Sequence, residues 1–335
     1  MRSFGIEKIY YIPEGNFFSR FIFLLKSIKL TKNIKKIEDF INLKYENIDI
    51  GKTTYDHWIR FTGIGSTDLI SPKIIYFLSK ALLVQNFSKE LFESNSFKEV
   101  VQCESQFIPS SIIFQNSLIN NCNVYARIGI GNKISVMIYN DLKNMYTDRF
   151  CFSKNLFQLI YNNYPNKIFD KTNEIMKKRF LNIQEYAVDH NIEEYMEHKF
   201  DVQENLNNNY SKKDLCNKFD WDTNKPIVVI FSNDLTDGVF RIDWKIFKDN
   251  LTGIKETLNI IKEIEHINWL VKPHPNDIKN NVVTSAETEV VRLSKFYKNI
   301  KLFPKNFGNN PIPEIISAAV TMGGSVGYEF PSFGI

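Results

Sequence analysis

The stretch from residue 227 to residue 271 constrains the fold more than any other part of the chain. It begins with the apolar run Ile227–Phe231 (IVVIF) and ends with NWLV at 268–271. Apolar residues between the two runs lie three or four positions apart, at Trp244, Phe247, Leu251, Ile254, Leu258 and Ile261. That spacing places them on one face of a helix. A strand, a helix and a second buried strand form a right-handed crossover unit, so the sequence predicts an α/β domain with a parallel sheet.

Two further strands are predicted after this unit, around 300–303 and 318–322, and helices at 285–297 and 312–317 precede them. The pattern is typical of a doubly wound α/β domain. The polar stretch 205–226 ends in a proline before the first strand, which indicates a domain boundary near its start. We therefore expect a C-terminal domain over 206–335.

The first part of the chain, 1–205, is predicted to form a second α/β domain, because 335 residues exceed what one hydrophobic core usually supports. The run 98–104 is predicted to be a strand, 112–118 a helix and 123–130 a strand, and 134–139 extends this alternating pattern. Apolar residues at helical spacing continue from 155 to about 198.

Charge and cysteine usage exclude some classes of protein. The formal net charge of +4 is far below that of a nucleic-acid-binding protein. The four cysteines, Cys103, Cys122, Cys151 and Cys216, form no CxxC pair, which argues against a zinc site and a disulfide framework. A reducing cytoplasm fits this composition best.

The apolar stretch Phe17–Leu30 contains Arg20, Lys26 and Lys29, and is too short and too charged to be a membrane span or a secretory signal. Two interpretations stay open for it. The favoured one is a core helix with a solvated basic face. The other is a basic amphipathic helix that lies on an anionic membrane surface, which would place the protein at the inner face of the cytoplasmic membrane.

Residues suited to binding an anion follow three of the predicted strands. They are Ser232–Gly238 (SNDLTDG), Lys272–Pro275 (KPHP) and Gly323–Glu329 (GGSVGYE). Ligands of doubly wound sheets bind beyond the carboxyl ends of the strands, so these segments are predicted to converge on one crevice.

The residue types in this crevice suit a phosphate group. Lys272 and His274 supply cationic or hydrogen-bond-donating groups, and the flanking prolines stiffen the backbone. The glycine turn lets the backbone approach a ligand closely and can aim N–H groups at an anion. Glu329 is placed to accept hydrogen bonds from ribose hydroxyls, and Pro331 is expected to end or kink the last helix.

The KPHP motif after one strand and GGSVGYEFPSFGI after a later one resemble bacterial capsule and surface-polysaccharide glycosyltransferases. This family is related to the enzymes that transfer Kdo from its CMP-activated form. The resemblance covers approximately 226–335 and is closest over 243–275 (Asp243–Pro275). It extends more loosely to 50–60 and 104–109.

The resemblance implies a GT-B fold, in which two Rossmann-like doubly wound domains face a cleft. It also implies that the nucleotide is bound by the two motifs, through Lys272, His274, Pro275, Gly323, Gly324, Ser325, Val326, Gly327 and Glu329. The family pattern continues beyond Ile335, so the C-terminal domain is expected to be truncated. The resemblance further implies that no metal or other cofactor is required. The sequence agrees, since its one DxD-like triplet, Asp220-Trp221-Asp222, precedes a strand and would miss the crevice.

By the same resemblance, Glu104 faces the cleft and is the candidate general base on the acceptor hydroxyl. Asp234 and Asp237 are rivals for that role or for substrate binding, and an acid that only caps a turn is the alternative for all three. His57 and Arg60 are candidates for binding an anionic acceptor or the donor carboxylate, or for a structural ion pair.

The predicted reaction is a direct displacement with inversion, in which Lys272 and His274 stabilise the negative charge on the departing nucleotide. The expected donor is Kdo or a related nonulosonate linked to CMP, and the expected acceptor is a bacterial surface polysaccharide or glycolipid. Two alternatives stay open: a transferase with a UDP-sugar or CDP-polyol donor, and a non-catalytic subunit of a polysaccharide-assembly complex.

Overall fold

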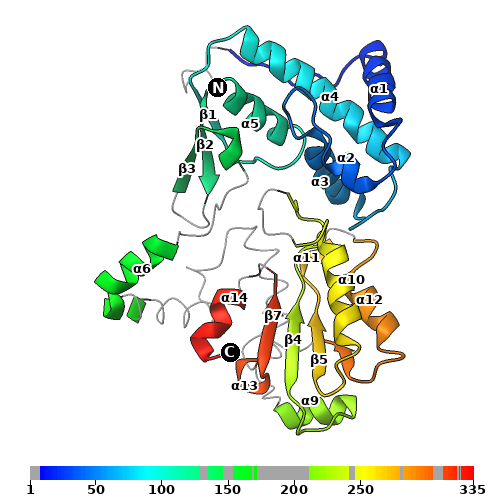
Figure 1. The fold of residues 1–335 in the computed structure, drawn as a ribbon, viewed down its shortest axis with the longest axis vertical. Coiled ribbons are helices and arrows are strands. Elements are labelled where there is room, and N and C mark those ends of the chain that lie inside the picture. The colour runs from blue at the N-terminus through cyan, green and yellow to red at the C-terminus, as the bar shows by residue number, and fades with distance from the viewer. Residues whose placement is uncertain are drawn as a thin grey trace.

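The computed structural model describes residues 8–128, 135–145, 154–167, 170–171, 211–240, 246–279, 282–304, 312–322, 324 and 326–335. Its described elements form a mixed α/β structure with parallel strand pairs (Figure 1). The proposed domain boundary near residue 205 lies outside the described residues. Within the part of the chain that is described, no helix is both long and apolar enough to cross a bilayer.

The C-terminal sheet has four parallel strands in the order β6-β5-β4-β7. The strands are β4 (Ile227–Phe231), β5 (Asn268–Lys272), β6 (Ile300–Leu302) and β7 (Ala318–Thr321). All four were predicted from the sequence. The buried run of β4 occupies an inner position between β5 and β7, as expected for a strand that is apolar on both faces.

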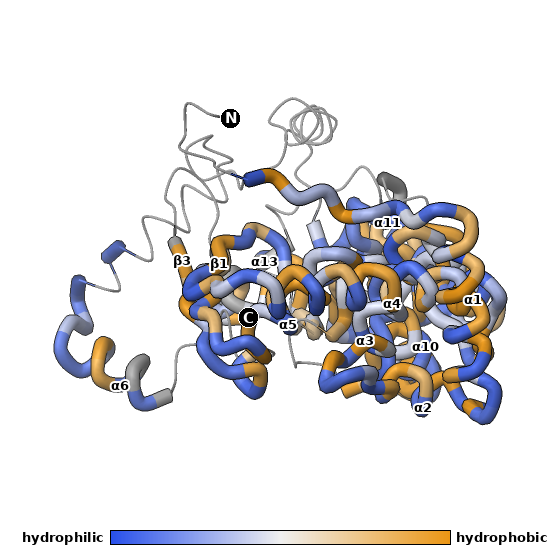
Figure 2. The backbone as a smooth tube through the Cα atoms, turned by 90° about the horizontal axis from the view of Figure 1, so that it is seen from above, coloured by the Kyte–Doolittle hydropathy of each residue, from blue (hydrophilic) through white to orange (hydrophobic). Residues whose placement is uncertain are grey.

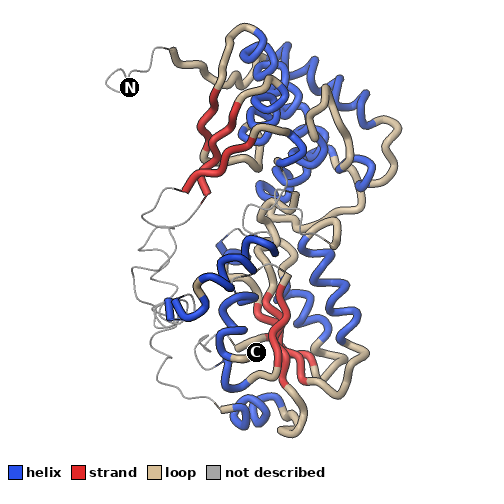
Figure 3. Tube along the Cα trace, turned by 60° about the vertical axis from the view of Figure 1, so that its left-hand side comes forward, coloured by secondary structure: helices blue, strands red, loops and turns tan. Residues whose placement is uncertain are grey.

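Helices cover both faces of this sheet, as Figure 3 shows for the layers around the strands. Side chains of α10 (Asn250–Ile261) and α12 (Ala286–Leu293) pack with Val228, Ile230 and Val271 on one face. On the other face, Val229 and Leu270 pack with residues of α9 (Lys212–Phe219), α13 (Ile312–Ile315), α14 (Val326–Glu329) and η4 (Phe330–Phe333). The doubly wound arrangement predicted for this half is therefore present in the described residues.

One local prediction in this half is corrected. The long helix does not include Phe247, because Asp249 caps it: its Oδ1 accepts the N–H of Thr252 at 2.7 Å, and the helix begins at Asn250. Trp244 lies outside the described residues. The polar stretch before β4 contains α9, whose capping box pairs Ser211 with Asp214.

The N-terminal half is dominated by helices. They are α1 (Phe17–Thr31), α2 (Ile37–Ile41), α3 (Ile50–Thr62), α4 (Pro72–Glu93), α5 (Ser110–Ile119), η2 (Leu142–Asn144) and α6 (Lys154–Asn163). A small sheet joins them in the order β1-β2-β3, formed by β1 (Glu99–Gln102), β2 (Asn123–Ile128) and β3 (Ser135–Tyr139).

The prediction of a second doubly wound domain is not met in the described part of this half. Strands β1 and β2 are parallel, but β2 and β3 are antiparallel. Only the short segment 129–134 separates β2 from β3, and a parallel pair needs a crossover of about a dozen residues or more. The sequence spacing therefore permits a hairpin here and excludes a βαβ unit.

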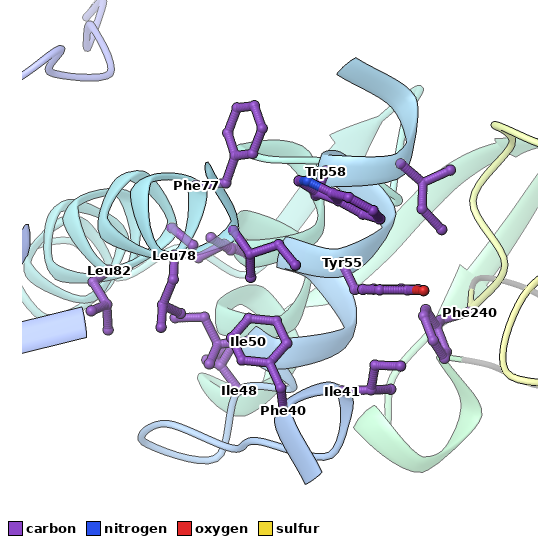
Figure 4. Packing of buried hydrophobic residues seen from close by; sticks show 14 of the residues in the cluster. Phe40, Ile41, Ile48, Ile50, Tyr55, Trp58, Phe77, Leu78, Leu82 and Phe240 are labelled. Carbon is purple, nitrogen blue, oxygen red and sulfur yellow. The ribbon is translucent and has the colours of Figure 1, made fainter. Parts of the chain in front are cut away.

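The largest core of the N-terminal half lies between α2, α3 and α4, with Tyr55, Trp58 and Leu78 fully or almost fully buried (Figure 4). Val239 and Phe240, which follow β4 in the C-terminal half, belong to the same core. The Phe240 ring lies edge-on to the Tyr55 ring, with centroids 6.1 Å apart. The two halves thus share hydrophobic packing through the segment after β4.

Candidate functional site

The three segments singled out in the sequence start from one edge of the C-terminal sheet. In the strand register, Phe231 at the end of β4 is paired with Lys272 on one side and with Thr321 on the other. The segments that begin at Ser232, Pro273 and Met322 therefore leave the sheet together. The three strand ends therefore lie at one edge of the sheet, as predicted, and their convergence on one crevice stays a prediction.

Asp234 organises the loop after β4. Its Oδ1 accepts hydrogen bonds from the backbone N–H and the hydroxyl of Thr236, both at 2.9 Å, and its Oδ2 accepts one from Asn276 Nδ2 at 3.1 Å. Its backbone carbonyl accepts one from Asn250 Nδ2 at 2.8 Å. The carboxylate is buried, so this network matches the turn-capping alternative for Asp234 more closely than the role of a base.

His274 is held by the loop after β4 and by its own segment. Its backbone N–H donates to Ser232 Oγ at 2.9 Å, and its Nδ1 accepts the N–H of Asn276 at 3.2 Å. Burial lowers the pKa of His274. A neutral imidazole whose Nδ1 is an acceptor carries its proton on Nε2, so His274 can offer a ligand one N–H donor but no positive charge.

Lys272 lies on the same face of the sheet as Leu270, because alternate residues of a strand share a face. That face is covered by α13, α14 and η4. The Lys272 ammonium lies 4.6 Å from the centroid of the Phe303 ring, and burial lowers the pKa of Lys272 to about 8. It therefore remains mostly protonated at pH 7, as a cation on the side of the sheet that carries the glycine turn.

The glycine turn is tightly built around Thr321. Gly324 N–H donates to Thr321 Oγ1 at 3.0 Å, and a Cβ on Gly324 would lie 2.8 Å from that oxygen. Helix α14 ends at Glu329, and η4 continues through Pro331, as predicted from the proline. Gly323, Ser325 and the side chain of Glu329 lie outside the described residues; Val326 and Gly327 begin α14.

The N-terminal half contributes Arg60 and Asp56 to this region, both from α3. Arg60 Nη1 lies 3.7 Å from Asp234 Oδ2 and donates to Thr236 Oγ1 at 3.4 Å. Asp56 is almost fully buried, and its two oxygens accept the N–H groups of Val239 at 2.9 Å and Phe240 at 3.2 Å. The loosely matching segment 50–60 is thus a helix that binds the loop after β4.

Glu104 and Asp237 lie in segments of the two halves that contact each other. Glu104 follows β1, and its Oε1 accepts the N–H groups of Ser105 and Gln106 at 2.7 Å each. Gln106 Nε2 in turn donates to the Gly238 carbonyl at 3.5 Å. Asp237 is exposed to solvent, and its Oδ1 accepts the N–H of Gly238 at 2.9 Å. Burial, then the charges of Asp234 and Glu104, raise the pKa of Asp237.

The surroundings of His57 do not suit its predicted role in binding an anionic substrate group. It is buried between aromatic rings, with its ring centroid 4.2 Å from Phe61 and 4.9 Å from Phe77. Burial, followed by the charge of Lys80, lowers the pKa of His57 to about 4. A neutral, packed imidazole cannot attract an anion by charge, which argues against the proposed anion-binding role.

Three polar residues of the site were not singled out from the sequence: Asp56, Asn276 and Asp277. Asp277 Oδ1 accepts the N–H of Leu235 at 3.4 Å, and burial raises its pKa to about 6. Asn276 and Asp277 directly follow KPHP, so extending the motif by two residues would have found them. Nothing local marks Asp56, because its partners are far away in the chain.

The neighbourhood of the site includes a small pocket between the halves, lined by Lys52, Asp56, Ser105, Gln106, Ser111 and Phe240 among others. A larger pocket of about 240 Å³ lies between α10 and α12, away from the strand ends.

The two carboxylates of the DxD-like triplet, Asp220 and Asp222, precede β4 and lie at the opposite edge of the sheet from His274. Among the described residues, no cluster of three or more His, Cys, Asp or Glu side chains could hold a metal ion.

Comparisons with protein-family models, curated proteins and solved structures find no match to this chain. Its function is therefore argued from the geometry of the site.

Proposed function

We propose that this protein is a nucleotide-sugar glycosyltransferase whose donor phosphate binds at the carboxyl edge of the C-terminal sheet. One observation carries the proposal. The loop after β4 leaves the sheet at the same edge as Lys272 and the KPHP segment, and it contacts the other half through Asp234 with Arg60 and through Gly238 with Gln106. A donor bound at that edge and an acceptor bound by the other half would meet between the halves.

The donor side has the groups that a departing nucleotide needs. The Lys272 ammonium supplies positive charge, and the His274 Nε2–H supplies a hydrogen-bond donor. We assign CMP as the nucleotide and a nonulosonate as the sugar by resemblance. A UDP-sugar or CDP-polyol donor would use the same phosphate-binding groups.

Two carboxylates near the contact between the halves are candidates for the general base: Glu104 of the N-terminal half and Asp237 of the loop after β4. Asp237 is the stronger candidate, because its raised pKa brings its basicity closer to neutral pH and it remains accessible. In the proposed step, the acceptor hydroxyl attacks the anomeric carbon and gives its proton to the carboxylate. The bond from that carbon to the phosphate oxygen breaks, and its electron pair leaves with the nucleotide.

Addition of a nucleotide that binds only the folded protein is expected to raise its melting temperature. The measurement compares CMP, CDP, UDP and GDP in thermal unfolding of the chain. A selective shift with CMP supports the nonulosonate donor, and a preference for UDP or CDP assigns one of the rival donors. Absence of any shift at millimolar nucleotide would contradict the proposal.

Nucleotide affinity is expected to fall as pH rises through about 8, the pKa to which burial lowers Lys272. A bound phosphate favours the protonated ammonium, so binding is strongest below that pKa and weakens by up to about tenfold per pH unit above it. Calorimetric titration between about pH 7.5 and 9.5 covers the range in which the Lys272 ammonium loses its proton. Lys272→Met should bind weakly with a flat pH profile; an unchanged slope in that variant would remove Lys272 from the site.

A further inference from the structure

Helix α1 carries an apolar face that points into solvent. Its members are all exposed and lie on one side of the helix: Phe17, Phe18, Phe21, Ile22, Leu25 and Ile28. Phe17 is 87% exposed and Phe18 71%. We call this set the α1 apolar face. Its existence contradicts the interpretation of this stretch as a core helix whose exposed face is basic.

The opposite side of α1 makes the packing contacts with the rest of the protein. Ser27 and Thr31 are buried there, Phe23 and Leu30 are partly buried against the core, and α4 is the main neighbour. Figures 1 and 2 both show α1 at an outer edge of the molecule. The α1 apolar face is therefore not needed to attach the helix.

Positive charge continues the α1 apolar face at its C-terminal end. Lys29 lies four residues after Leu25 and Lys32 four after Ile28, so both lysines share the side of the apolar residues. Lys35 and Lys36 follow, and all four lysines are exposed. The sequence of α1 itself contains no Asp or Glu.

We propose that α1 binds the surface of a bilayer that contains anionic lipids, with the helix lying in the plane of the interface. A bilayer offers an acyl boundary to the phenylalanine, isoleucine and leucine side chains and anionic headgroups to the lysines. A second copy of the chain, joined through the same face, would bring no acidic residue of α1 to neutralise those lysines. This inference is independent of the proposed transferase activity.

Flotation of the protein with vesicles tests the proposal. Wild type is expected to bind vesicles of phosphatidylcholine with about 30% phosphatidylglycerol more strongly than pure phosphatidylcholine vesicles, and high salt should weaken the binding. The double variant F21D/L25D should lower the partition coefficient by about tenfold or more, since two apolar side chains no longer enter the interface. Both replaced side chains are exposed, so the fold should persist in circular dichroism.

Phe296→Asp is the matched control, because Phe296 is 76% exposed but far along the chain, after α12. It should bind vesicles like wild type. The double variant K29Q/K32Q should reduce the preference for anionic vesicles while retaining weak binding to both compositions. Absence of wild-type binding to anionic vesicles, or unchanged binding by F21D/L25D, overturns the proposal. A dimer in analytical ultracentrifugation that F21D/L25D dissociates, without vesicle binding, would assign the face to a second copy.

Discussion

Replacement of Asp56 by Ala is expected to lower the free energy of unfolding by about 3 kcal/mol, because two hydrogen bonds to a charged acceptor are lost at once. The N–H groups of Val239 and Phe240 would remain buried without that acceptor. Chemical denaturation followed by fluorescence measures the change. The unfolding free energy of Asp56→Asn should lie between those of the wild type and Asp56→Ala, since its single carbonyl oxygen can replace only one of the two acceptor oxygens.

The control for this change is Asp39→Ala. Asp39 is exposed in the first turn of α2, and its loss should change the unfolding free energy by no more than about 0.5 kcal/mol. Equal effects of the two substitutions would contradict the view that α3 holds the loop after β4 through Asp56.

If the protein is the proposed transferase, replacement of His274 by Ala is expected to lower turnover by about 10²-fold or more, because it removes the donor assigned to the charge that grows on the leaving nucleotide. The assay follows release of CMP from a CMP-activated nonulosonate in the presence of acceptor glycan. If the thermal shifts select another nucleotide, the corresponding sugar donor replaces it.

His274→Gln separates the chemical role of this residue from a structural one. Its side-chain amide can donate a hydrogen bond in place of Nε2–H, so it should recover part of the lost turnover. His274→Ala also removes the acceptor for the Asn276 N–H, and the melting temperature of each variant reports that structural loss. Unchanged turnover in His274→Ala would remove this residue from the proposed mechanism.

Local patterns in the sequence were sufficient to predict the four strands of the C-terminal sheet. The apolar run of β4 and the helical spacing from Leu251 to Ile261 each report one element, and the crossover rule fixes how they join. The segments after β4 and β5 could be placed at one edge for the same reason. The predicted start of α10 was wrong because one capping side chain, Asp249, begins the helix at Asn250 although apolar residues at helical spacing continue before it.

The contacts between the two halves could not be predicted from such patterns. Asp56 and Arg60 bind a loop nearly 180 positions further along the chain, as the hydrogen bonds to Val239 and Thr236 show. The burial of His57 between Phe61 and Phe77 could not be predicted either, since a histidine at this position of a helix could face the core or the solvent. The exposure of Phe17 and Phe18 could be recognised only once the partner face of α1 was known.

The strand order of the C-terminal sheet also has a consequence for how this half folds. Strand β4 pairs with β5 across a connection of 36 residues (232–267), whereas its pairing with β7 closes one of 86 residues (232–317), at an additional entropic cost of about 0.8 kcal/mol. We therefore expect β4 and β5 to associate first and β7 to dock later. The glycine turn that follows β7 would then acquire its native shape only in the last stage of folding.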